Sequence, residues 1–283
     1  MRYGHLAWPD VRDIDKDKII LLPLGSCEQH GPHMPLLTDT LLVTAFAESV
    51  EEAMGDDVLL LPTQWMGMSD HHLNFAGTVT ANPELYTRWL VRTLETLLKH
   101  GFRKIFMLNG HGGNQVPANQ ALVELYSRGY ERPDTWIGFA SYWHLGAPSI
   151  EKGHKEGLDG VRFESPMLTH ADEWEYSLGL HVFPQLCQPE KAKAIPTDFK
   201  TDYYDVDLSK HVIGLSTPFT AFIPTGAANH PEKASAEKGA ALFGGIRGDL
   251  LKFFGEFKDW REHRSDRDMG QLDRKSTRLN SSH

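Results

Sequence analysis

The sequence of 283 residues contains only two cysteines, Cys27 and Cys187. Two thiols are too few for a disulfide framework in a chain of this length, which favours a reducing compartment. No apolar run approaches the roughly 20 residues that a membrane-spanning helix needs. The N-terminal residues 1–5 have no apolar signal core. We therefore expect a cytoplasmic protein without a membrane partner.

Positive charge is also scarce. Lys and Arg number 29 against 38 Asp and Glu, which gives a net charge of -9. Phosphate backbones and anionic membranes attract basic surfaces, so this balance argues against a nucleic-acid partner. The remaining composition is ordinary, with 40% hydrophobic and 24% charged residues. A chain of this kind can bury a sizeable core.

Short apolar runs alternate with segments of helical periodicity. The apolar runs, typical of strands buried on both faces, are residues 17–24, 58–62, 104–108 and 135–140. The helical segments are residues 40–53, 83–100, 114–126, 171–180 and 235–254. This alternation predicts an α/β fold with a mainly parallel central sheet and helices on both faces.

Two segments depart from this alternation. Residues 146–165 are rich in Gly and charge, and we expect a long, mobile excursion near the site there rather than a domain boundary. We predict one domain over residues 1–262, followed by a polar tail over 263–283. Within that tail, residues 273–283 (DRKSTRLNSSH) resemble the translation of a common sequencing-adapter oligonucleotide. We expect this string to be foreign to the natural chain, without a part in the fold or the site.

Histidine is abundant, with 15 residues, and several lie where predicted strands end. Ligands of open α/β sheets bind outside the carboxyl ends of the strands. After the first strand come Glu28, His30 and then Asp39. On extended backbone Glu28 and His30 point to the same side, and a carboxylate with an imidazole suits Zn, Mn or Fe. The alternative is a loop ion pair, with Asp39 as a helix cap.

A glycine-rich segment, Asn109-Gly110-His111-Gly112-Gly113-Asn114, follows the strand at 104–108. Glycine allows a sharp turn and the close approach of a ligand, so His111 could reach a metal. An ordinary strand–helix turn is the alternative. A phosphate site is disfavoured, because the segment has neither the Lys-Ser/Thr of a P-loop nor a GxGxxG pattern.

Acidic residues gather at the head of the helix predicted over residues 171–180. Asp172, Glu173 and Glu175 could simply favour the helix dipole there. However, Glu173 and Glu175 stand about 200° apart on a helix of roughly 3.6 residues per turn, so only one can face a metal. His170, just before the helix, could serve as a general acid or base.

A fourth polar patch comprises residues 69–72 (SDHH) with Gly77 and Thr78. Side chains of adjacent histidines usually splay apart, so a metal shared by His71 and His72 is not expected. Substrate contact and plain surface are equally open interpretations here, since loops often carry function.

Taken together, these segments resemble the creatininase (creatinine amidohydrolase) family. The matching segments occur in family order over residues 8–255 and are 22–26, 28–33 with Asp39, 109–114, 141–143, 170–177 and 234–239. The resemblance implies a three-layer α/β/α sandwich and two divalent metal ions, Zn, Mn or Fe, that activate a bridging water. It also implies a homo-oligomer, often a hexamer.

The resemblance also implies a set of site residues. Glu28 and His30 would each hold one metal, Asp39 would bridge both, and His111 would join the first. Creatininase itself has Glu where this chain has Gly113, and in relatives with Gly a glutamate aligned with Glu175 takes part instead. His170 and Glu173 are then the expected proton carriers. The expected substrate-binding residues are Ser69, His71, Thr78, Gly112, Gly113 and Trp143.

Departures from the family pattern point away from creatinine as substrate. Thr169 replaces a Glu, and a second tryptophan that encloses creatinine has no counterpart beside Trp143. The polar residues Asp172, Tyr176 and His71 would suit a hydroxyl-rich ligand. We expect a hydrolase that opens a cyclic amide or cyclic ketone of a small polar substrate. The alternatives are a keto-inositol ring C–C hydrolase, a metal phosphoesterase, and an inactive protein that only binds a small molecule.

Overall fold

The computed structural model describes residues 1–130, 134–166, 168–193, 201–203 and 219–260. Its centre is a sheet of four parallel strands, ordered β2-β1-β3-β4. The strands are β1 (Ile19–Leu24), β2 (Val58–Leu60), β3 (Lys104–Asn109) and β4 (Trp136–Ser141). The predicted parallel sheet is confirmed, with β2 shorter than expected. The predicted tail and the last two residues of the predicted domain lie outside the described residues.

Strand β1 lies inside the sheet, and all six of its residues are buried. It carries Pro23, which cannot donate a backbone hydrogen bond. Proline is tolerated here because the ladder to β2 ends at the pair Leu21 and Leu60, before Pro23 is reached. The carbonyl of Pro23 still accepts from the Gln64 amide at 3.0 Å.

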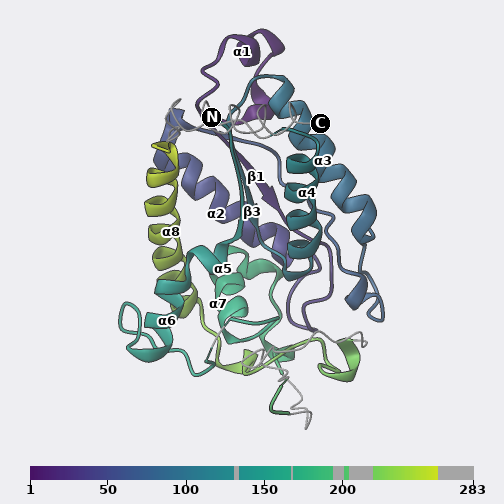
Figure 1. Cartoon of the computed structure of the whole chain (residues 1–283). Coiled ribbons are helices and arrows are strands. Elements are labelled where there is room, and N and C mark those ends of the chain that lie inside the picture. Colours follow the sequence, from purple (N-terminus) through teal and green to yellow (C-terminus); the bar gives the residue numbers. More distant parts are fainter. Residues whose placement is uncertain (131–133, 167, 194–200, 204–218, 261–283) are drawn as a thin grey trace, which may run out of the picture.

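Helices cover both faces of the sheet, which confirms the three-layer fold (Figure 1). One face packs against α2 (Thr38–Met54) and α8 (Ala236–Lys258), with α5 (Tyr142–Leu145) and α7 (Glu173–Val182) near the strand ends. The other face packs against α3 (Pro83–Lys99) and α4 (Gln115–Ser127). The short α1 (Trp8–Asp13) precedes β1. Among the described residues, no helix is long and apolar enough to cross a membrane.

The start of α7 brings the third cluster into the interior. The Asp172 side chain accepts from the amides of Trp174 and Glu175 at 3.0 and 2.9 Å, so the helix begins at Glu173 rather than at Ala171. An aspartate at this position satisfies amides that have no partner within the helix. Both Glu173 and Glu175 lie in the first turn and are buried.

The expectation of a mobile excursion over residues 146–165 is wrong for its first half, which forms α6 (Ala147–Lys155). Pro148 is compatible with the first helical turn. Gly153 lets the helix approach the Trp174 ring, because a Cβ at this position would lie 3.1 Å from it. Because α6 contains few apolar residues, its sequence shows no clear helical periodicity, and the helix was not predicted.

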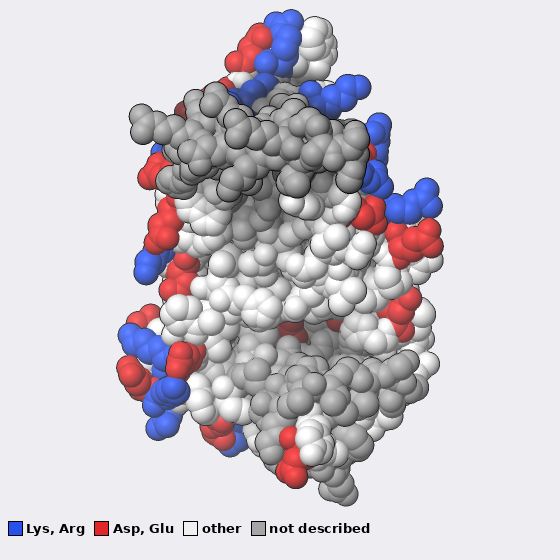
Figure 2. All heavy atoms as spheres, viewed as in Figure 1, with Lys and Arg blue, Asp and Glu red and all other residues white. Residues whose placement is uncertain are grey.

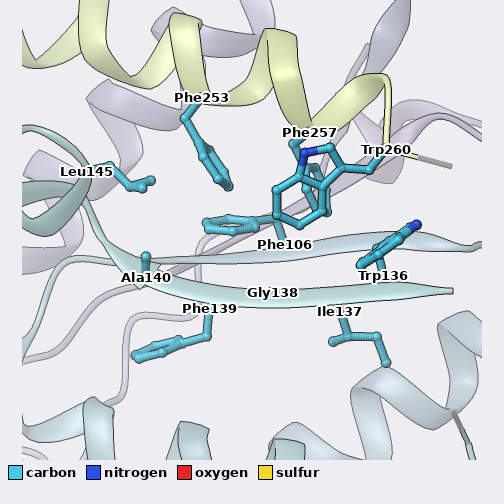
Figure 3. Close-up of a pocket in the computed structure, with 10 residues that line it drawn as sticks. All are labelled: Phe106, Trp136, Ile137, Gly138, Phe139, Ala140, Leu145, Phe253, Phe257 and Trp260. Carbon is cyan, nitrogen blue, oxygen red and sulfur yellow. The ribbon is translucent and has the colours of Figure 1, made fainter. Parts of the chain in front are cut away.

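Strand β4 forms one edge of the sheet, and beside it runs an apolar groove of about 240 Å³ (Figure 3). Figure 3 shows Trp136 and Phe106 turned toward Phe253, Phe257 and Trp260 of the α8 side. Among the described residues, none that lines the groove is charged. Figure 2 shows a largely uncharged band across the corresponding face, with charged side chains at its margins.

Candidate metal centre

The strand register places the functional loops level with one another. Leu24 of β1 pairs with Asn109 of β3, and Asn109 pairs with Ser141 of β4. The loops that follow therefore leave the sheet at the same height, as expected of ligand sites in α/β folds. Asn114 joins two of these loops, since its amide donates to the Gly25 carbonyl and to the Asn109 side chain at 3.0 and 3.1 Å.

A hydrogen bond at Nε2, on the side of the ring away from the carboxylates, fixes the orientation of His111. Its Nε2 lies 2.9 Å from the Met68 carbonyl, which can only accept, so this nitrogen carries the proton. In the neutral ring Nδ1 then has a lone pair. This nitrogen lies 3.0 Å from Asp39 Oδ2 and 3.3 Å from Glu28 Oε1. A lone pair that faces two carboxylate oxygens is unfavourable, so this nitrogen either carries a second proton or shares a cation with the carboxylates.

His30 repeats this arrangement on the other side of Asp39. Its Nδ1 lies 3.3 Å from the Glu28 carbonyl, which fixes the proton on that nitrogen. Its Nε2 lies 3.1 Å from Asp39 Oδ1 and 3.6 Å from Glu175 Oε2. Metal-binding histidines commonly donate their second N–H to a carbonyl in this way.

Asp39 lies between the two histidines, and each of its oxygens faces a different ring. The resulting groups are Glu28 and His111 on one side, and His30 and Glu175 on the other. All five side chains are buried, with at most 4% of any residue exposed. The structure thus brings together every residue predicted to hold a metal, from four segments of the chain.

The two glutamates of α7 separate as predicted from their helical spacing. Glu175 faces His30, and its Oε2 also accepts from the Ala171 amide at 2.6 Å. Glu173 points elsewhere: its Oε1 lies 2.5 Å from Lys238 Nζ, and its Oε2 accepts from the amides of Glu164 and Ser165. The structure does not bring Glu173 to the other site residues, so a catalytic role for it stays a prediction.

The charges of the cluster shift its pKa values in opposite directions. Burial would lower the pKa of His111, but Glu28 and Asp39 beside it raise that pKa to about 10. Burial would raise the pKa of Glu28, but His111 and His72 hold it well below its usual value. Burial dominates at Glu175 and raises its pKa. The cluster therefore favours a positive charge in its centre, either protons on the histidines or metal ions.

His170 lies at the rim of this cluster, with 15% of its side chain exposed. Its Nδ1 is 3.8 Å from Glu28 Oε1, and its ring centroid is 4.4 Å from that of His30. Among the predicted proton carriers, it is the one placed beside the candidate metal ligands.

Two residues of the cluster were missed by sequence reasoning. His72 Nε2 lies 3.3 Å from Glu28 Oε1, and Gln29 joins His72 to His170 through its side-chain amide. The expectation that His71 and His72 splay apart is wrong: their ring centroids are 4.3 Å apart, and His71 stacks on His111. The 3₁₀ turn at Asp70–His72 turns both rings toward the cluster. The sequence signal that could have indicated Gln29 was its position between the predicted ligands Glu28 and His30.

The predicted substrate-binding residues fall into different places. Ser69 is buried beside His111, with its Oγ 3.2 Å from Nε2, and Thr78 donates to the His72 carbonyl at 3.2 Å.

Gly113 has no room for a side chain, because a Cβ there would lie 2.1 Å from the Met68 carbonyl oxygen. A Cβ at Gly112 would meet nothing within 4 Å. Trp143 lies on α5 and packs edge-on against Tyr142. Substrate contact by these residues stays a prediction.

Asp172 does not fit the idea of a hydroxyl-binding carboxylate. It is fully buried, and both of its oxygens accept hydrogen bonds from its own segment, from residues 169, 174 and 175. Tyr176 is also buried, packed edge-on against His33. Of the three polar residues expected to favour a sugar-like ligand, His71 is the one beside the cluster.

Comparison with known proteins agrees with this geometry. The family model for creatinine amidohydrolase matches residues 4–254. The 3-dehydro-scyllo-inosose hydrolase of Thermotoga maritima is 33% identical over 175 residues, which cover 62% of this chain and 53% of that protein. The chain thus matches about half the length of that relative. Creatinine amidohydrolase of Pseudomonas putida is 28% identical over 254 residues, which cover 84% of this chain and 90% of that protein.

Solved structures extend the likeness to the fold. A crystal structure of creatinine amidohydrolase superposes with a TM-score of 0.74 at 25% identity, covering 92% of this chain and 98% of that one. Two further creatininase structures, at 24% identity, are described as a mutant of the Zn-Zn type and as creatininase Mn. At that identity they support the fold of this chain alone.

Proposed function

The chain belongs to the creatininase family, and from this membership and the strand-end cluster we propose that it is a divalent-metal hydrolase of a small, polar, cyclic substrate. The observation that carries the proposal is the position of Asp39. Each of its oxygens lies close to the ring nitrogen of a different histidine, Oδ1 at 3.1 Å from His30 Nε2 and Oδ2 at 3.0 Å from His111 Nδ1. A carboxylate in this position can serve two metals at once.

The residues fit a pair of divalent cations. Glu28, Asp39 and His111 would hold one, and His30, Asp39 and Glu175 the other. The three carboxylates are buried, and Glu28 Oε2 makes no hydrogen bond among the described residues. Buried carboxylates without a compensating charge are costly, so a bound cation would stabilise this group. Mixed imidazole and carboxylate ligands suit Zn and Mn.

When bound, such metals would polarise a carbonyl and lower the pKa of a water, so that the water loses a proton near neutral pH and can attack the carbonyl. The chain's own residues do the positioning. The Met68 carbonyl and Ser69 hold the His111 ring from behind, and the Glu28 carbonyl holds His30. His170 lies at the exposed rim of the cluster, where it can hydrogen bond to a substrate. These contacts keep the ligands oriented before a substrate arrives, which is how enzymes lower barriers.

The substrate class has two candidates. Family membership favours hydrolysis of a cyclic amide. The relative from Thermotoga maritima favours ring opening of a keto-inositol, because at 33% it is more similar over the matched region than creatinine amidohydrolase of Pseudomonas putida at 28%. The polar ring of His71 beside His111 would suit either. The complete set of ligands speaks against a protein that only binds its ligand.

Metal analysis and a substrate panel test the proposal. Protein purified without added metal should carry Zn, Mn or Fe, close to two ions per chain. Asp39→Asn should lose both ions, since Asp39 faces both groups. Hydrolysis of creatinine, other lactams or keto-inositols should stop with chelator. Protein without bound metal, or activity that resists chelation, would refute the metal mechanism. Tight ligand binding without turnover would support the binding-protein alternative.

We also propose that the chain forms a homo-oligomer, with the edge of β4 as one contact between copies. The described residues that line the groove between β4 and α8 are all uncharged, so two copies of a chain with net charge -9 can meet over them without charge repulsion between these residues. An edge strand can pair with its own copy across a two-fold axis. Sedimentation of Trp136→Glu should show smaller particles than the native protein, and an unchanged mass would exclude this edge.

A further inference from the structure

Gln29 occupies a bridging position between the two histidines at the rim of the cluster. Its side chain is buried, and Nε2 lies 3.0 Å from His72 Nδ1 and 2.8 Å from His170 Nε2. Its Oε1 accepts from the Gly31 amide at 2.9 Å. This third contact determines the orientation of the amide. If the amide were turned over, its NH₂ group would face the Gly31 N–H, which cannot accept a hydrogen bond.

The amide orientation in turn determines where the histidine protons are. The NH₂ group of Gln29 has two hydrogens, one for each ring, so both ring nitrogens that it faces must accept. A neutral imidazole has one proton, which is then on the other nitrogen. These are Nε2 of His72 and Nδ1 of His170, at 3.3 and 3.8 Å from Glu28 Oε1.

The surroundings of Gln29 leave it little freedom to turn. Gly226, with a positive φ of 76°, packs so closely that a Cβ there would lie 1.8 Å from Gln29 Oε1. The same segment holds His170, since the Ala228 amide donates to the His170 carbonyl at 2.9 Å. The rings of His72 and His170 stack at 4.7 Å. The segment at 226–228 therefore contacts the amide at Oε1, and the two rings contact it at Nε2.

We propose that Gln29 is a positioning residue, which fixes His72 and His170 in the tautomers that direct their N–H groups toward Glu28. The consequence for catalysis rests on the proposed hydrolase function. The Nδ1–H of His170, 3.8 Å from Glu28 Oε1, is then the group of this ring that can donate a hydrogen bond to a substrate oxygen beside Glu28. It can take up a proton only on Nε2, and only after the bond from Gln29 is broken. His72 then carries its proton on Nε2, 3.3 Å from Glu28 Oε1, and so does not bind a metal through that nitrogen.

Histidine ring ¹⁵N NMR tests the tautomers directly, because protonated and unprotonated ring nitrogens have distinct chemical shifts. The sample is the full chain labelled with ¹⁵N-histidine, measured both without metal and with Zn. Signals of the two rings are assigned with His72→Asn and His170→Asn. We expect unprotonated Nδ1 in His72 and unprotonated Nε2 in His170. A proton on His170 Nε2 in the native protein would overturn the proposal.

Gln29→Glu is the matched variant, because it keeps the shape and replaces the NH₂ group with an oxygen that only accepts. His72 Nδ1 and His170 Nε2 should then become protonated. Gln120→Glu adds the same charge at an exposed position of α4 and should leave both rings as in the native protein. Unchanged signals in Gln29→Glu would contradict the proposal. If that variant does not fold, the native spectrum still decides.

Kinetics connect the tautomers to the reaction. Once a substrate is known, Gln29→Glu should lower kcat by ~10- to 100-fold, as for other residues that orient a catalytic group, with a smaller change in KM. If Gln29→Glu lost this much kcat while the ring tautomers stayed as in the native protein, Gln29 would have a structural role and the positioning role would be refuted. The NMR measurement does not depend on activity, so it stays valid even if the hydrolase proposal fails.

Discussion

Glu173 and Glu175 lie in the same turn of α7, and both are buried, yet their surroundings differ completely. Glu173 meets a positive charge from its own chain, Lys238 at 2.5 Å. Glu175 meets the ring of His30 at 3.6 Å and another carboxylate, Asp39, beyond it. One carboxylate is neutralised by a lysine of the fold, and the other faces the proposed metal site. If the proposal holds, a single helix turn serves stability on one side and ligand binding on the other.

Glu175→Gln should have the largest effect on function. The amide keeps the shape but removes the charge beside His30, so the second metal should be lost and bound metal should fall to close to one ion per chain. Activity should fall by at least ~100-fold, whereas the melting temperature of the metal-free protein should change little. Metal analysis with differential scanning calorimetry measures both. Full metal content in this variant would remove Glu175 from the ligand set.

Glu173→Gln should show the opposite result. Lys238, with 15% of its side chain exposed, would lose its partner, and breaking such a buried pair costs roughly 3 kcal/mol. Bound metal should stay as in the native protein. Urea unfolding gives the free-energy difference. A drop in kcat without loss of stability would instead support the predicted catalytic role of Glu173.

The double variant Glu173→Gln with Lys238→Met sharpens this point. If the two side chains act as an ion pair, their single effects will not add, and the coupling should be ~1–3 kcal/mol. Lys238→Met keeps an apolar stem beside the Phe163 ring, over which Lys238 now lies. Additive effects would show that Glu173 acts mainly through its bonds to the backbone amides.

Metal binding at the candidate centre should also depend on pH. Without metal, the pKa of His111 is raised to about 10, so the ring is protonated at pH 7 and its proton must leave before Nδ1 can bind a metal. Metal affinity should therefore increase with pH up to about 10, by at most tenfold per unit for each proton released. Titration calorimetry of Zn binding in buffers of different ionisation enthalpy counts the protons. Zero protons released at pH 7 would contradict this coupling.

The sequence was sufficient for the sheet and most helices, because short apolar runs and 3.6-residue stripes are strong local signals. It was also sufficient for Glu28 and His30, which are neighbours on one loop. Helical spacing predicted that only one of Glu173 and Glu175 can face the site, and the family resemblance pointed to Glu175. The position of α7 required its cap, Asp172, to be recognised as a cap rather than a ligand-binding group.

The missed features depend on contacts between distant segments. Gln29 and His170 are 141 residues apart, and Glu173 and Lys238 are 65 apart. No local pattern reports such a pair, since it arises only when strand register and helix packing bring the segments together. Helix α6 was missed for another reason: it packs through Gly153 against the rings of Trp174 and Phe163 rather than through a long apolar stripe. Whether the chain is one domain over 1–262 stays a prediction.

Gly113 limits how this centre could change over evolution. In creatininase itself the resembling position has a glutamate, whereas here even a single carbon would collide with the Met68 carbonyl. A mutation to Glu at 113 would disturb the backbone that holds His111 before it could offer a new ligand. Under the proposed assignment, a ligand supplied by this loop instead of α7 would first require the backbone at Met68 to move.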